Sequence, residues 1–84
     1  MKKILFILLL LSQSVLAQTG IGTTTPDASA KLEIASTTKG FLVPRMTATQ
    51  KTAISLPATG LLIYQTDAPV GFFVNTGTSA SPTW

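Results

Sequence analysis

The sequence predicts a mainly β fold with one short helix, built from short antiparallel strands and a hairpin, and this fold is expected to be incomplete in a single copy of the chain. Apolar residues occur in short runs or alternate with polar ones, and proline and glycine separate these runs. At 84 residues the chain holds one domain at most. A domain of this size buries only about 60% of its unfolded surface, so we expect self-association to supply the missing stability.

Residues 1–17 are predicted to be a secretory signal peptide. The chain starts with the basic residues of MKK, an unbroken apolar run covers residues 4–11, and VLA forms a small-residue cleavage pattern. The alternative, a membrane anchor, requires about 20 apolar residues. We therefore expect cleavage between Ala17 and Gln18, contact with the membrane only during export, and a mature protein that is secreted or held at the cell surface.

Charge and composition argue against several functions. Cleavage removes two of the six basic residues, and the four that remain, against three acidic ones, give a net charge of +1. The basic residues are not clustered, so nucleic acid is not an expected partner. The chain has no cysteine and no histidine, so we predict no disulfide, no metal site and no cofactor.

No catalytic site is predicted. The acidic residues Asp27, Glu33 and Asp67 fall in different predicted elements, and no histidine is present to activate a hydroxyl nucleophile. Gly20 and Gly22 lack the strand, helix and lysine of a phosphate-binding loop. We predict that the chain is not an enzyme.

Residues 18–38 are predicted to form an extended, Thr/Ser-rich segment with one short strand. Residues 18–30 show no periodicity and favour a solvated linker. Residues 31–35 alternate polar and apolar, which predicts a strand with Leu32 and Ile34 on one face.

Residues 39–84 are predicted to form a small β-rich module that begins with a strand at 41–43. Pro44 ends this strand because it has no amide hydrogen to donate. Arg45 follows at a corner and is interpreted as a surface arginine. Its alternative role is to pair with Asp67 of the same or a neighbouring copy.

A short helix is predicted from Ala48 to about Ser55. Thr47 and Gln50 have the spacing of a capping box, and a proline after the helix ends it and favours an extended residue before it. Two turns are unstable alone. We expect three side chains of this segment to dock on the sheet: Ala53, Ile54 and Leu56. Lys51 is expected on the exposed side.

A hairpin is predicted from strands 61–66 and 72–75, joined by residues 67–71. The first strand is apolar on both faces, with Leu61 and Ile63 on one and Leu62 and Tyr64 on the other. One subunit encloses both faces, or a neighbouring copy covers the second. The second interpretation is favoured, because 67 mature residues hardly supply two covering layers.

The aromatic residues of the hairpin region and the C-terminus allow two interpretations. Tyr64, Phe72, Phe73 and Trp84 are interpreted as core residues, with a sugar-stacking face as the alternative. Trp84 is expected to begin a further strand, and the chain is therefore expected to be a fragment of a longer gene product.

Several motifs, taken in their order along the chain, resemble those of a known family. They are GIGTT…P…AKLEI at residues 20–34, GFLVPRMT with a later Gln at 40–50, PATGLLIYQTD at 57–67, and GFFVNTG at 71–77 followed by Trp84. Together they resemble segments of trimeric phage tail fibres and of long bacterial surface fibres of the Bacteroidetes type.

The resemblance implies a homotrimeric β-rich stalk or head segment with a structural or adhesive role and no enzymatic activity. It also implies that residues 18–30 form a wound fibre strand instead of a linker. The predicted leader favours a bacterial surface protein over a phage protein. The alternative function is a small carbohydrate-binding module at the cell surface that binds surface glycans through Tyr64, Phe72 and Trp84. No residue is assigned to a binding site.

Overall fold

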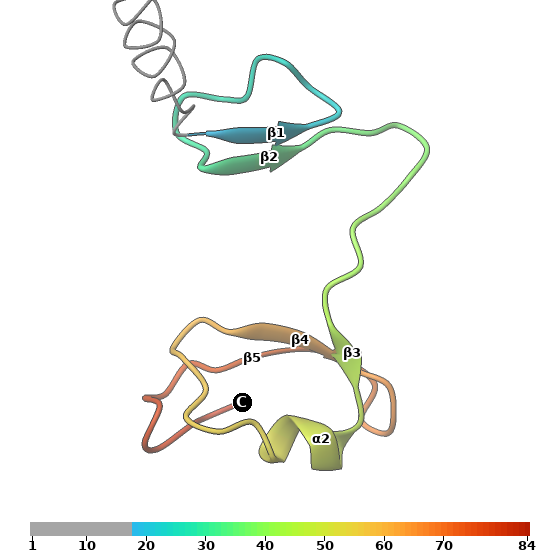
Figure 1. The fold of residues 1–84 in the computed structure, drawn as a ribbon. Coiled ribbons are helices and arrows are strands. Elements are labelled where there is room, and N and C mark those ends of the chain that lie inside the picture. The colour runs from blue at the N-terminus through green and yellow to red at the C-terminus, as the bar shows by residue number, and fades with distance from the viewer. Residues whose placement is uncertain (1–17) are drawn as a thin grey trace, which may run out of the picture. The chain divides into compact units, whose positions relative to one another are not determined.

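The computed structural model describes residues 18–84, which divide into two units at residues 18–40 and 41–84. The predicted fold class is confirmed: the chain is mainly β with one short helix, and its strands form a two-stranded and a three-stranded sheet (Figure 1). The predicted signal peptide lies outside the described residues and stays a prediction.

The first unit is a parallel two-stranded ribbon. β1 (Thr19–Ile21) pairs with β2 (Leu32–Ile34), with Thr19 opposite Leu32 and Ile21 opposite Ile34. The strand predicted within residues 31–35 is confirmed. The linker interpretation of residues 18–30 is wrong, because β1 lies within them and gains backbone hydrogen bonds from β2.

The connection between β1 and β2 is closed by polar side chains. The Gln18 amide nitrogen donates to the carbonyls of Asp27, Ala28 and Ala30 at 2.9, 3.1 and 3.0 Å. The hydroxyl and the amide of Ser29 both donate to Asp27 Oδ1, and these bonds lower the pKa of the Asp27 carboxyl below its usual 3.8. These contacts make a compact loop without an apolar core of its own.

The second unit contains a sheet in the order β3-β4-β5. β3 (Arg45–Met46) runs parallel to β4 (Leu62–Gln65), which is antiparallel to β5 (Gly71–Val74). The predicted hairpin is therefore confirmed. Its strands are slightly displaced from the predicted bounds, and Asn75 lies just beyond β5.

The prediction of a strand at residues 41–43 is wrong, because β3 begins only after Pro44. The Tyr64 amide donates to the Pro44 carbonyl at 3.0 Å, and the Thr66 amide donates to the Met46 carbonyl at 2.9 Å. Continuing this parallel register would need the amide of residue 44 to donate to β4. Proline has no such hydrogen, so residues 41–43 leave the sheet.

The helix α2 (Ala48–Thr52) begins with the predicted capping box. The Gln50 amide donates to Thr47 Oγ1 at 3.2 Å, and the Thr47 amide donates to Gln50 Oε1 at 2.9 Å. Asp67 Oδ1 also accepts from the Ala48 amide at 2.7 Å, which ties the helix start to the end of β4. Within residues 18–84, no helix has the length and apolar character needed to cross a membrane.

The helix ends earlier than predicted and docks differently. Its C-cap is Ala53, and Leu56 has a φ of 46° instead of the expected extended geometry. Leu56 is 71% exposed and Ala53 is also exposed, so the expectation that they dock on the sheet is wrong; Ile54 is half-buried. A leucine in the left-handed region costs about 1–2 kcal/mol.

The interior of the second unit contains few large apolar side chains. Val43 and Ile63 form the buried apolar core, whereas Lys51, Gln65 and Asn75 are the buried polar or charged residues. A core of two apolar side chains is small even for a chain of this length. Hydrogen bonds of the buried polar side chains must therefore contribute much of what fixes the fold of this unit.

Asn75 is the centre of these contacts and is fully buried. Its Nδ2 donates to the carbonyls of Pro57 and Ala58 at 2.9 and 3.3 Å. Its Oδ1 accepts from the amides of Gly77 and Thr83, both at 2.9 Å. One side chain thus joins the turn before β4, the end of β5 and the C-terminal loop.

We predict that Asn75→Ala destabilises the protein by about 3 kcal/mol or more, because it leaves several buried backbone groups without partners. The measurement is urea unfolding followed by circular dichroism at a fixed chain concentration, since self-association makes stability depend on concentration. Thr76→Ala is the control: it removes one exposed bond to Thr83 and should change stability by less than about 1 kcal/mol. Equal effects of the two substitutions would contradict the role of Asn75.

Candidate functional site

One face of the three-stranded sheet carries a continuous set of large side chains. Leu62 lies opposite Val74, and Tyr64 lies opposite Phe72 and, on its other side, Arg45. Cross-strand partners and alternate residues of a strand share a face. We call these five residues the outer face.

The outer face is uncovered in a single copy of the chain. Phe72 is 65% exposed, and Leu62 and Val74 are also exposed. On the opposite, inner face, Ile63 is 2% and Gln65 is 1% exposed. The structure therefore excludes the interpretation in which one subunit encloses both faces of β4.

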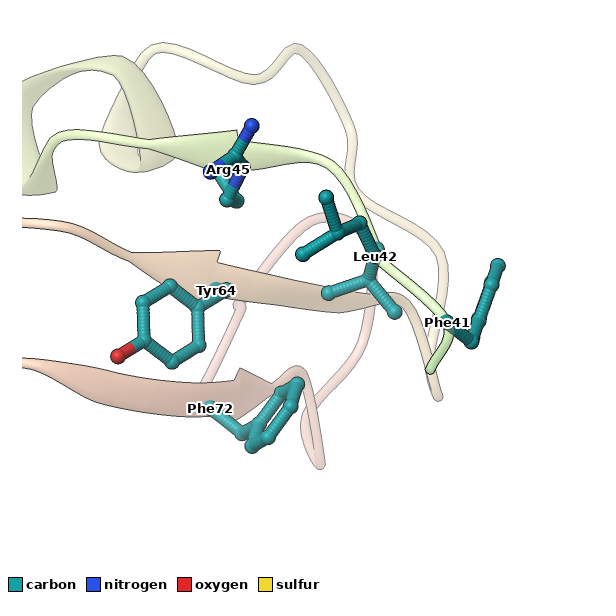
Figure 2. A pocket seen from close by; sticks show the side chains of 6 residues that line it. Phe41, Leu42, Arg45, Tyr64 and Phe72 are labelled. Carbon is teal, nitrogen blue, oxygen red and sulfur yellow. The ribbon is translucent and has the colours of Figure 1, made fainter. Parts of the chain in front are cut away.

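A hollow of about 300 Å³ lies at one end of the outer face (Figure 2). Residues 41–43 line it together with Arg45, Tyr64 and Phe72. The rings of Tyr64 and Phe72 meet edge to face, with centroids 5.2 Å apart and an interplanar angle of 79°. Phe41 and Leu42 extend the exposed apolar surface, a position that the strand predicted at residues 41–43 does not give them.

Arg45 lies on the rim of the hollow and is exposed, as predicted for a surface arginine. The alternative role of Arg45 is to pair with Asp67 of the same chain. Oδ1 of that carboxylate accepts from the Ala48 amide at 2.7 Å, so it is engaged at the helix start. A pairing between Arg45 and an acidic residue of a neighbouring copy stays a prediction.

Lys51 is buried, which makes the prediction of an exposed lysine wrong. Its Nζ lies 3.8 Å from the centroid of the Phe73 ring and 5.8 Å from that of the Trp84 ring. The five-residue helix has no apolar stripe, so the aliphatic stem of Lys51 covers the sheet and its ammonium group meets aromatic faces.

The C-terminal tryptophan belongs to the inner side of the sheet. Figure 1 shows the C-terminus between β5 and α2, and Trp84 is half-buried there. It is not part of a strand within residues 18–84, and the expectation that a strand begins at Trp84 and continues beyond residue 84 stays a prediction. Contact with Lys51 and the hydrogen bonds of Thr83 hold this end of the chain instead.

The four aromatic residues do not form one platform. Tyr64 and Phe72 lie on the outer face, whereas Phe73 and Trp84 lie on the inner side with Lys51 between them. Sugar-stacking sites need aromatic rings that face the same ligand. The carbohydrate-binding alternative through Tyr64, Phe72 and Trp84 is therefore not favoured.

The acidic residues have structural contacts. Glu33 Oε1 accepts from the Asp27 amide at 2.8 Å in the first unit, and Asp67 caps the helix in the second. Within residues 18–84, acidic side chains do not gather into a group of three that could hold a metal ion.

Gly22 has a φ of 78° beside Ala35, and Gly20 lies against its own loop.

Comparison with protein families gives a match that covers most of the chain. A family model described as "phage tail like trimerisation region" matches residues 20–84, from within β1 to the C-terminal tryptophan. No curated protein and no solved structure matches the chain. The matched region includes the outer face, the hollow, the whole second unit and residues 20–40 of the first unit.

We predict that Lys51→Ala destabilises the protein by about 1–2 kcal/mol, through lost packing of the stem and lost cation–π contact. Lys51→Met keeps most of the packing and should cost less. Trp84 is the only tryptophan, so its fluorescence reports unfolding and its local environment. Lys39→Ala is the control at an exposed lysine. An unchanged Trp84 emission and stability in Lys51→Ala would contradict the contact.

Proposed function

The chain belongs to the phage tail like trimerisation region family, and from this premise we propose that it is an exported segment of a trimeric fibre at a bacterial cell surface. Family membership supports self-association as a trimer and a structural role. A trimerisation region acts through its shape and its interface, which agrees with the prediction that the chain is not an enzyme.

The observation that carries the proposal is the uncovered outer face beside a minimal core. Burial of a large apolar side chain contributes about 1.5–3 kcal/mol, and the outer face offers Leu62, Phe72 and Val74 in each copy. The hollow and the exposed side chains of Phe41 and Leu42 extend the same surface. Three copies that meet through this surface bury what a single copy leaves in water.

Arg45 fits the edge of such an interface better than its centre. An uncompensated buried charge is costly, whereas a paired charge at the rim selects the partner and the register. Three copies of Arg45 around a symmetry axis require three carboxylates, one from each neighbour. We propose Asp67 of the neighbouring copy as the carboxylate, through the oxygen that does not cap the helix.

The surface location and the adhesive role are the finer part of the proposal. The predicted leader supports export. Cleavage after Ala17 leaves Gln18, whose side chain closes the first unit, in the mature protein. We propose that the segment supports adhesion by presenting the assembled trimer at the bacterial surface. The resemblance to long surface fibres of the Bacteroidetes type favours a bacterium of this group.

We predict that the purified chain is a trimer and that Phe72→Asp weakens its self-association at least about thirtyfold, since loss of a central aromatic contact costs about 2–4 kcal/mol and each 1.4 kcal/mol is a factor of ten. Sedimentation velocity and light scattering over a concentration series measure this.

The matched control places the same charge elsewhere. Thr49→Asp introduces an aspartate on the exposed side of α2, and it should leave the trimer intact. A wild-type chain that is monomeric at high micromolar concentration would contradict the proposal. A trimer that persists in Phe72→Asp would show that the interface lies outside the outer face.

We predict that export in a bacterial host yields a mature chain that starts at Gln18, because residues 15–17 supply the cleavage pattern. Intact-mass spectrometry of the exported protein measures the cleavage site. Ala17→Lys is the control and should block processing. A secreted or surface-held protein that retains residues 1–17 would contradict the prediction, and protease treatment of whole cells tests surface exposure.

A further inference from the structure

The first unit carries a second uncovered apolar face. Thr19 and Ile21 of β1 lie opposite Leu32 and Ile34 of β2, so all four side chains share one face of the ribbon. Ile21 is 55% and Leu32 is 51% exposed, and Ile34 is exposed as well. We call this set of four residues the ribbon face.

The opposite side of the ribbon is closed by its own loop. A methyl group built on Gly20 would lie 2.5 Å from the Thr23 carbonyl oxygen and 3.0 Å from the Pro26 ring. Glu33, the other residue of this side, accepts a hydrogen bond from the Asp27 amide at 2.8 Å. The loop therefore covers the side of Gly20 and Glu33 and leaves the ribbon face bare.

We propose that the ribbon face is a second self-association surface, occupied by the ribbon faces of the other copies of this chain. The inference rests on the proposed trimeric function and adds a separate contact to it. The outer face lies in residues 41–84, and the ribbon face lies wholly in residues 18–40.

Two observations select another copy as the occupant. The family model for a trimerisation region starts at residue 20, within β1, so the whole ribbon except Thr19 belongs to the matched region. The ribbon face contains three aliphatic side chains and one threonine, and no charge. Identical faces of this kind can meet around an axis without burying unpaired charges.

The stability of the ribbon also requires a partner. A two-stranded sheet is marginal in water unless its apolar face packs on something. Burial of Ile21, Leu32 and Ile34 in each copy contributes about 1.5–3 kcal/mol per side chain. Because the ribbon and the second unit are parts of one chain, association at one surface raises the effective concentration at the other.

The test uses engineered cysteines, because the chain contains none. Ile34→Cys places a thiol on the ribbon face, and Lys31→Cys places one at an exposed neighbouring position whose side chain alternates to the other side. The full chain is treated with a short bis-maleimide at a concentration where it is trimeric. We expect Ile34→Cys to give covalent dimers at least about five times faster than Lys31→Cys, because thiols gathered around an axis react at a high effective concentration.

Ile21→Cys, the cross-strand partner position, is the second variant in case Ile34→Cys perturbs the ribbon, and it should cross-link in the same way. If the chain is trimeric by light scattering and both ribbon variants cross-link no faster than Lys31→Cys, the ribbon proposal is overturned and the proposed trimer stands. If the unmodified chain is a monomer, both proposals fall.

Discussion

Two fully buried amide side chains hold residues 41–84 together where other small domains use an apolar core. Asn75 bonds the turn before β4 to the C-terminal loop. Gln65 Nε2 donates to the carbonyls of Asp67 and Pro69 at 3.1 and 3.0 Å, which fixes the hairpin connection. Hydrogen bonds inside a protein define geometry because few alternative partners are available. The shape of the unit therefore depends on directional bonds, and most of its large apolar side chains face outward.

This arrangement links folding to assembly. The apolar core consists of Val43 and Ile63, and Gln65 Oε1 is buried without a hydrogen-bond partner among the described residues. A buried acceptor in this state costs about 1–3 kcal/mol, and Leu56 adds backbone strain. A unit with a small core and such costs is marginal as a monomer. An association that buries the outer face, as proposed, would stabilise the folded chain by mass action and couple folding to trimer formation.

Local signals in the sequence predicted the local features. The capping box of Thr47 and Gln50 and the hairpin were identified because their determinants lie within a few residues. The apolar side chains on both faces of β4 also predicted an apolar face in need of a partner. The parallel pairings of β1 with β2 and of β3 with β4 were missed, since register between distant segments has no local signature. Burial of Lys51 was missed for a related reason: it depends on where Phe73 and Trp84 lie in space.

The strand edges favour closed over open association. β3 has two residues and is ended by Pro44, and β5 has four. Short edge strands, and an edge strand bounded by proline as β3 is, are poor templates for pairing with another sheet. Association along an edge would also leave the outer face in water, and it would continue without limit. Association through the outer face around a symmetry axis buries the apolar residues of every copy and ends after a fixed number of copies. A chain with short edges and a broad apolar face is thus suited to a closed trimer, which explains how it can expose so much apolar surface in one copy and still form a defined assembly.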